Sequence, residues 1–151
     1  MKKIFLIIIT LFLYSCGFTP IYSSKDSNYR IISFDKNVNN NLTNYIQNSI
    51  SVLSNKESKK NFSIDLNFNE SISVILKDSK GDPKKNRLTI DIDLIVMDNV
   101  GNLITSKEFS ENFEYNISDN KFDTKEYEKN IKFNLVEDIT QQILIFLANL
   151  K

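Results

Sequence analysis

The chain has 151 residues, and its 19 basic residues balance its 19 acidic ones, so its formal net charge is zero. A nucleic-acid-binding domain is expected to be basic, so this balance argues against one. The chain has no histidine and a single cysteine. It therefore lacks an internal disulfide and the ligands or bases on which most metal sites and catalytic triads depend.

The N-terminus has the layout of a secretory signal. Lys2 and Lys3 precede an apolar run over residues 4–14, which is too short to span a bilayer, since that takes about 20 apolar residues. Leu13, Ser15 and Cys16 then resemble a bacterial lipobox, with Tyr14 bulkier than the usual occupant. We expect a lipoprotein signal peptide over residues 1–15.

Cys16 is the expected lipid-attachment residue, because a sulfur nucleophile accepts the diacylglycerol. The mature Cys16 would carry an N-acyl chain and an S-diacylglycerol, and we expect no other cofactor. Several acyl chains anchor a protein stably, whereas one chain does so only marginally. Two alternatives stay open: the end of an uncleaved membrane anchor, or an incidental buried thiol.

The rest of the chain has the size of one domain. Removing residues 1–15 leaves 136 residues. Two basic residues and no acidic ones lie in the signal, so the remainder has a net charge of −2. Residues 16–27, which include Pro20 and a serine-rich run, are expected to form a lipidated tether. Residues 28–151 are expected to form a single domain.

The first half of that domain predicts a strand, a helix and a second strand. Residues 29–34 are rich in β-forming types. Asn39, Asn40 and Asn41 can cap a helix, and apolar residues spaced by three and four follow over residues 42–53. Alternation over residues 62–68 then predicts a half-buried strand. The same parity continues to residue 76, so the strand is either long or carries a bulge near residues 70 and 71.

A cationic segment follows at residues 77–87, which contain no apolar residue and include Gly81 and Pro83. We expect a loop here. Its local net charge is +3, because five basic residues face two acidic ones. Cationic side chains bind phosphates, so the loop is a candidate contact for an anionic phosphate ligand; the favoured alternative is a solvated hairpin tip, because charge runs are usually solvated. The candidate contacts are Lys77, Lys80, Lys84, Lys85 and Arg87.

The second half predicts two more strands and a long helix. Residues 88–96 alternate cleanly, residues 98–102 form a turn with Gly101, and residues 103–117 make a further strand. Asp123 with Glu126 resembles a capping box, and an apolar helical stripe runs from residue 127 to residue 150. The order β-α-β-β-β-α predicts an α+β two-layer sandwich: a four-stranded, mostly antiparallel sheet with two helices on one face.

The sequence offers no catalytic constellation. Asp91 and Asp93 share one face of a strand, and alternation alone explains them as its polar side. No serine lies in a G-x-S-x-G setting, and no histidine is present to activate one. Three glycines are too few for a phosphate-cradling loop. We therefore expect a protein that is not an enzyme, and a periplasmic hydrolase is the least favoured alternative.

The segment C-G-F-T-P-I-Y, residues 16–22, resembles the opening of the LPS-assembly lipoprotein LptE family of alphaproteobacterial type. Cys16, Gly17, Phe18, Pro20 and Tyr22 match, and Ile21 stands for leucine. The element order and the long last helix are also similar. The family shares no catalytic residue, so none is carried over.

The resemblance implies an outer-membrane lipoprotein on the periplasmic side. It would act as plug and assembly partner of an LptD-like β-barrel and contact lipopolysaccharide, with no nucleic-acid partner. Position 17 holds glycine in place of the aspartate that retains enteric lipoproteins in the inner membrane. The alternative is an auxiliary outer-membrane lipoprotein of a lipid-transporting ABC system.

Overall fold

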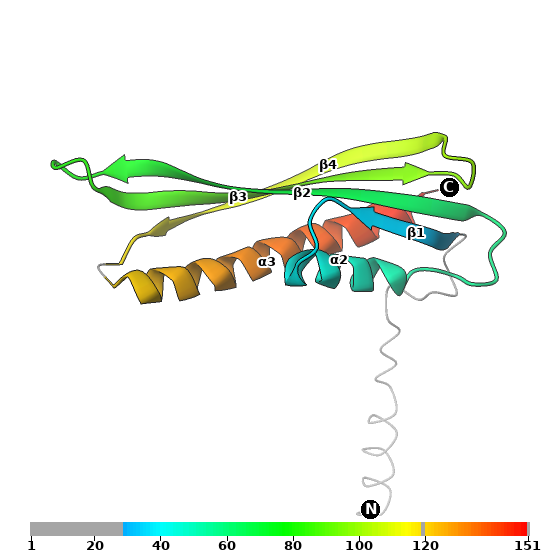
Figure 1. The fold of residues 1–151 in the computed structure, drawn as a ribbon, viewed down its shortest axis with the longest axis horizontal. Helices are drawn as coiled ribbons and strands as arrows, with labels where there is room; N and C mark the ends of the chain where they lie inside the picture. Colours follow the sequence, from blue (N-terminus) through cyan, green and yellow to red (C-terminus); the bar gives the residue numbers. More distant parts are fainter. Residues whose placement is uncertain (1–28, 119, 151) are drawn as a thin grey trace, which may run out of the picture.

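A computed structural model describes residues 29–118 and 120–150. Cys16, the expected signal peptide and the expected tether lie outside these residues. The described elements follow the order β-α-β-β-β-α (Figure 1). They are β1 (Arg30–Lys36), α2 (Asn41–Ser51), β2 (Asn61–Lys77), β3 (Pro83–Met97), β4 (Leu103–Asn116) and α3 (Lys121–Ala148).

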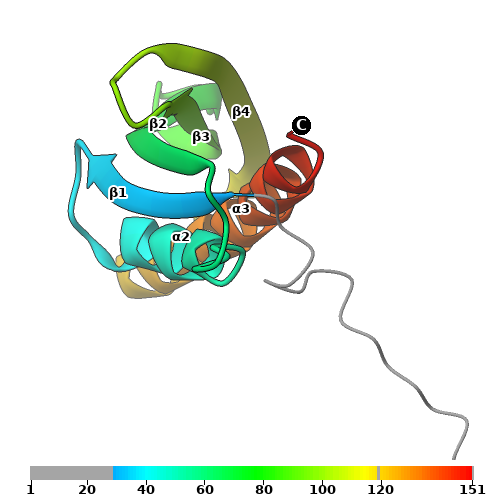
Figure 2. The same cartoon turned by 90° about the vertical axis from the view of Figure 1, so that its right-hand side faces the viewer.

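The four strands form one mixed sheet in the order β1-β2-β3-β4. β1 and β2 run parallel because α2 carries the chain back between them, and the other two pairs are antiparallel hairpins. Viewed along the long axis, both helices lie on one side of a curled sheet (Figure 2). The predicted two-layer α+β class is therefore confirmed.

The core lies between the sheet and the helices. Alternation puts every second residue of β3 on the helix-facing side, and all five apolar residues there, from Leu88 to Val96, are fully buried. α2 contributes Ile46 and Ile50. α3 contributes a row at intervals of four that covers the sheet over most of the helix, comprising Ile131, Leu135, Ile139, Ile143 and Leu147.

The helix starts agree with the sequence in one case and differ in the other. Asn40 caps α2 in a full capping box, since its side chain accepts from the Thr43 amide at 2.9 Å and the Thr43 hydroxyl accepts from the Asn40 amide at 3.1 Å. The expected cap of α3 at Asp123 is wrong. Asn120 is the N-cap, accepting from the Phe122 amide at 3.0 Å. Asp123 instead lies in the first turn, where the helix dipole favours a negative charge.

The hairpin between β2 and β3 is longer than the sequence indicated. The expected loop over 77–87 is wrong at both ends, because β2 runs to Lys77 and β3 already begins at Pro83. Backbone pairing with the neighbouring strand needs no apolar side chain, so polar residues extend the ladder. Of the two alternatives for this stretch, the structure has the long strand, without a bulge at residues 70 and 71. The β2–β3 register is continuous past Glu70, and it shifts between Val74 and Leu76 and between Leu76 and Lys77.

The far half of β2, Asn69–Lys77, departs from the expected burial. Ile72, Val74 and Leu76 keep the parity of the buried residues, yet they are 46%, 45% and 56% exposed. α2 has only 11 residues and lies under the half of the sheet near β1, so this stretch of β2 extends past it (Figure 1). The alternation of apolar residues along β2 could not show where α2 stops covering the sheet.

Candidate functional site

The tip of the β2–β3 hairpin is a tight turn organised by Asp78. Its backbone amide donates to the Asp82 carbonyl at 2.9 Å. Its carboxylate Oδ1 accepts from the amides of Lys80 and Asp82, both at 2.9 Å. The hydrogen bond from the Asp82 amide is the main reason that the pKa of Asp78 lies below its usual value. Gly81 closes the turn at φ +89°, a conformation that favours glycine.

The β3–β4 hairpin at the other end of the sheet uses the same turn. Asp98 accepts from the amides of Val100 and Asn102, at 2.8 and 2.9 Å, and Gly101 has φ +91°. Both turns read Asp-x-x-Gly-x. The shared pattern shows that the turn geometry is a folding device, because only the first of the two turns lies beside the predicted cationic cluster.

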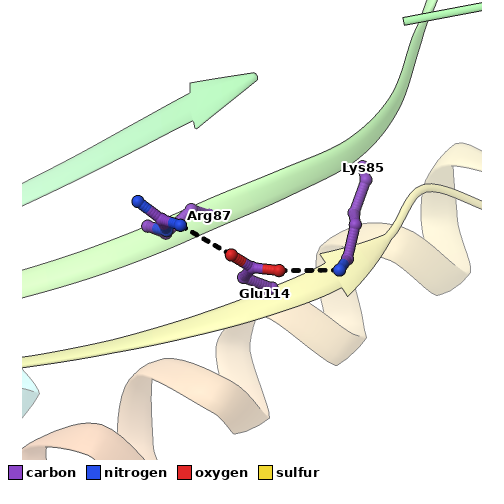
Figure 3. Close-up of polar contacts among 3 residues, drawn as sticks. All are labelled: Lys85, Arg87 and Glu114. Carbon is purple, nitrogen blue, oxygen red and sulfur yellow. Dashed lines mark hydrogen bonds and ion pairs between the residues drawn. The ribbon is translucent and has the colours of Figure 1, made fainter. Parts of the chain in front are cut away.

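Three charged side chains meet on the sheet face that the helices leave open (Figure 3). The Glu114 carboxylate on β4 accepts from Lys85 Nζ through Oε2 and from Arg87 Nη2 through Oε1, both at 2.6 Å. These two hydrogen bonds, that from Lys85 first, lower the pKa of Glu114. Two of the five predicted cations are therefore held by an acid that lies outside the loop in sequence.

The other three cations are placed differently. Lys84 Nζ lies 3.9 Å from the Asp78 carboxylate, a long contact. Lys77 and Lys80 are exposed at the tip and make no ion pair within residues 29–118 and 120–150. The tip thus carries a looser cationic group of Lys77, Lys80 and Lys84, separated in role from the Lys85–Glu114–Arg87 cluster.

A second charged region, which the sequence interpretation missed, lies between the two helices. A cavity of about 390 Å³ opens there. Lys132 Nζ lies 2.5 Å from Glu70 Oε1 on β2, which ties α3 to the sheet. The available signal was the spacing of Lys121, Lys125 and Lys129 at intervals of four along α3, which places them on one helix face. The cavity lining comprises Asn41, Leu42, Lys125, Glu128, Lys129 and Lys132.

A buried tyrosine connects the same part of α3 to β4. The Tyr115 hydroxyl donates to Glu128 Oε1 at 2.5 Å and lies 3.4 Å from Asn86 Nδ2. Desolvation by burial, followed by the Glu128 contact, raises the pKa of Tyr115 to about 12. Burial alone raises the pKa of Tyr29 to about 12 as well. Both hydroxyls therefore stay protonated at neutral pH and act in packing.

The acidic pair on β3 behaves as a polar strand face. Asp91 accepts from the Ser110 hydroxyl at 2.6 Å, and Asp93 is exposed. Within the part of the chain that the structure describes, no group of three or more histidine, cysteine, aspartate or glutamate residues is arranged to hold a metal ion. In the same part, no helix combines the length and hydrophobicity that crossing a membrane requires.

Comparison with solved structures shows that several bacterial lipoproteins share this fold. Lipoprotein B from Nitrosomonas europaea aligns with a TM-score of 0.62 and 14% identity, covering 85% of this chain and 88% of its own. The minor lipoprotein from Acinetobacter baumannii aligns with a TM-score of 0.61 and 12% identity, covering 81% and 92%. Rare lipoprotein B from Shewanella oneidensis aligns with a TM-score of 0.56 and 12% identity, covering 80% and 98%.

The chain has a fold found in bacterial lipoproteins. At these identities the likeness establishes the shared fold and leaves binding to be argued from the residues. No protein-family model and no curated protein sequence matches the chain.

Proposed function

We propose that this protein is an outer-membrane lipoprotein subunit of a lipopolysaccharide assembly complex, anchored through acylated Cys16 and facing the periplasm. It acts without catalysis, as plug and assembly partner of an LptD-like β-barrel. The observation that carries the proposal is the opening C-G-F-T-P-I-Y, residues 16–22, in front of a domain whose fold solved lipoproteins share.

Two features of the domain support a role inside a protein partner. The sheet face away from the helices carries mainly polar side chains, among them Asp91, Asp93 and Glu114, as expected for a surface that meets a hydrated barrel lumen. The hairpin tip carries Lys77, Lys80 and Lys84 where they can reach an anionic ligand. The tip is therefore the proposed contact for lipopolysaccharide phosphates, with Lys85 and Arg87 behind it.

Co-purification tests the partnership. Tagged protein extracted in mild detergent should bring down one large outer-membrane β-barrel. A matched Cys16→Ser variant should lose the lipid mass increment and accumulate as precursor or as a soluble form. Recovery of an ABC transporter in place of a barrel would favour the auxiliary-lipoprotein alternative. A wild-type protein with a free thiol and no added lipid mass would refute the anchor.

The lipid contact needs its own variant. Replacing Lys80, Lys84, Lys85 and Arg87 with serine should weaken lipopolysaccharide binding and flatten its dependence on salt, because cation–phosphate contacts are screened by ions. Unchanged affinity with an intact fold would leave the hairpin tip as a solvated turn.

A further inference from the structure

The far half of β2 has an open edge. Pairing with β1 ends at Leu66, and Asn37 then takes the place of a strand: its side chain donates to the Phe68 carbonyl at 3.1 Å and accepts from the Phe68 amide at 2.8 Å. In the sheet order of the described chain, no strand lies beside β2 on this side beyond that point.

The backbone direction along this edge follows from the same contacts. The Leu66 carbonyl and both Phe68 backbone groups point toward the β1 side. Strand residues alternate, so the amides and carbonyls of Glu70 and Ile72 also point to the open side. Those of Ser71 and Ser73 point toward β3, where the register is continuous. Pairing along the open side is therefore available without disturbing the hairpin.

Between Glu70 and the register shifts that begin at Val74, the edge sequence has no feature that blocks pairing. Natural sheets usually protect exposed edges with proline, with charges or with a covering element. Residues 71–76, S-I-S-V-I-L, contain no charge and no proline. Their apolar side chains are exposed, with Ile72 at 46% and Val74 at 45%.

Two cations line the cavity beside Lys132, the α3 residue that reaches this edge. Lys132 of α3 forms an ion pair with Glu70 at 2.5 Å. Glu128 accepts a hydrogen bond from the Tyr115 hydroxyl. Tyr115 also contacts Asn86, which pairs with Val74 of β2. The side of α3 that carries Lys132 therefore faces Glu70 on β2, and the 390 Å³ cavity between α2 and α3 is lined by Lys125, Glu128 and Lys129 together with Lys132. Lys132 and Glu128 have partners there. Lys125 and Lys129 form no hydrogen bond or ion pair with the rest of the described chain.

We propose that the open edge of β2 binds an extended segment of another protein, which adds as a strand and directs acidic side chains to Lys125 and Lys129. Main-chain hydrogen bonds would supply affinity, and the apolar residues and lysines would supply selectivity, as in other strand-addition complexes. A second copy of this chain fits less well, because its acid at this edge, Glu70, is already paired with Lys132. The inference goes beyond the proposed function, since it requires no barrel.

A peptide-binding assay with the full chain in detergent tests the proposal. The probe is a labelled synthetic peptide in which threonine alternates with valine and glutamate. We expect binding that Ile72→Pro abolishes, because proline has no amide hydrogen to offer the added strand. The matched control is Asn112→Pro on β4. The amide of Ile117, the residue after β4, donates to the Lys84 carbonyl of β3. By alternation the Asn112 amide faces away from the sheet, so this variant should bind normally.

Charge provides the second arm of the experiment. Replacing glutamate by lysine in the peptide, or Lys125 and Lys129 by glutamine in the protein, should each weaken binding about tenfold, since opposite charges select partners across an interface.

Three results would overturn the proposal. The first is equal peptide affinity in Ile72→Pro. The second is a dimer of the protein alone that Ile72→Pro dissociates, which would make a second copy the occupant. The third is a protein that does not bind the peptide but binds dodecyl phosphate, with an affinity that Ile72→Pro leaves unchanged. Loss of the barrel from the wild-type co-purification would instead refute the proposed function and leave the peptide result standing.

Discussion

Ile139 offers the sharpest test of how the two layers are held together. It lies in the middle of α3 with no exposed surface. Ile139→Asp removes an apolar side chain whose full burial stabilises the fold by about 1.5–3 kcal/mol. It also introduces a carboxyl without a partner into an apolar layer, at a further cost of about 2 kcal/mol or more. The sum, about 3.5 kcal/mol at least, is a large share of the stability of a typical domain, about 5–15 kcal/mol.

Urea unfolding followed by circular dichroism measures this cost. Ile145→Asp is the matched control, because Ile145 lies on the same helix but is 49% exposed, and surface substitutions usually stay within about 0.5 kcal/mol. Burial raises the pKa of the introduced carboxyl, so the Ile139→Asp variant should lose stability as the pH rises above about 4. An Ile139→Asp protein that unfolds at the same urea concentration as Ile145→Asp would refute the placement of α3 against the sheet.

Four further outcomes are expected from urea midpoints. Asn40→Ala should lower the free energy of unfolding by about 1 kcal/mol through loss of the α2 cap. Gly101→Ala should lower it by about 1–2 kcal/mol through backbone strain alone, since open space surrounds the added methyl. An unchanged free energy of unfolding in either variant would contradict the capping or turn geometry. The raised pKa of Tyr115, about 12, gives stability that is full below about pH 10 and is lost as the pH rises toward 12; Tyr115→Phe should flatten that alkaline loss. The lowered pKa of Glu114 gives stability that is present above about 4.5 and is lost at lower pH; an unchanged acid profile in Glu114→Gln would mean that its pairing with Lys85 and Arg87 does not stabilise the fold.

The hairpin tip shows what local sequence could not decide. Lys85 and Arg87 were predicted as part of a free cationic loop, yet Glu114 binds both. Glu114 is far from them in sequence, and only the β3–β4 register, which pairs Arg87 with Glu114, brings the charges together. The two Asp-x-x-Gly-x turns, in contrast, are local, and their hydrogen bonds join residues at most four apart.

Element order, strand alternation, the Asn40 cap and the apolar row of α3 were all determined by the sequence itself, because each depends on neighbours along the chain. Those features suffice for the α+β class, and the N-terminal motif suffices for the lipoprotein hypothesis. Tertiary structure alone decided where α2 stops covering the sheet. That boundary leaves Ile72 and Val74 exposed although their parity matches the core. Periodicity records which face of a strand a residue occupies, whereas burial depends on what packs against that face.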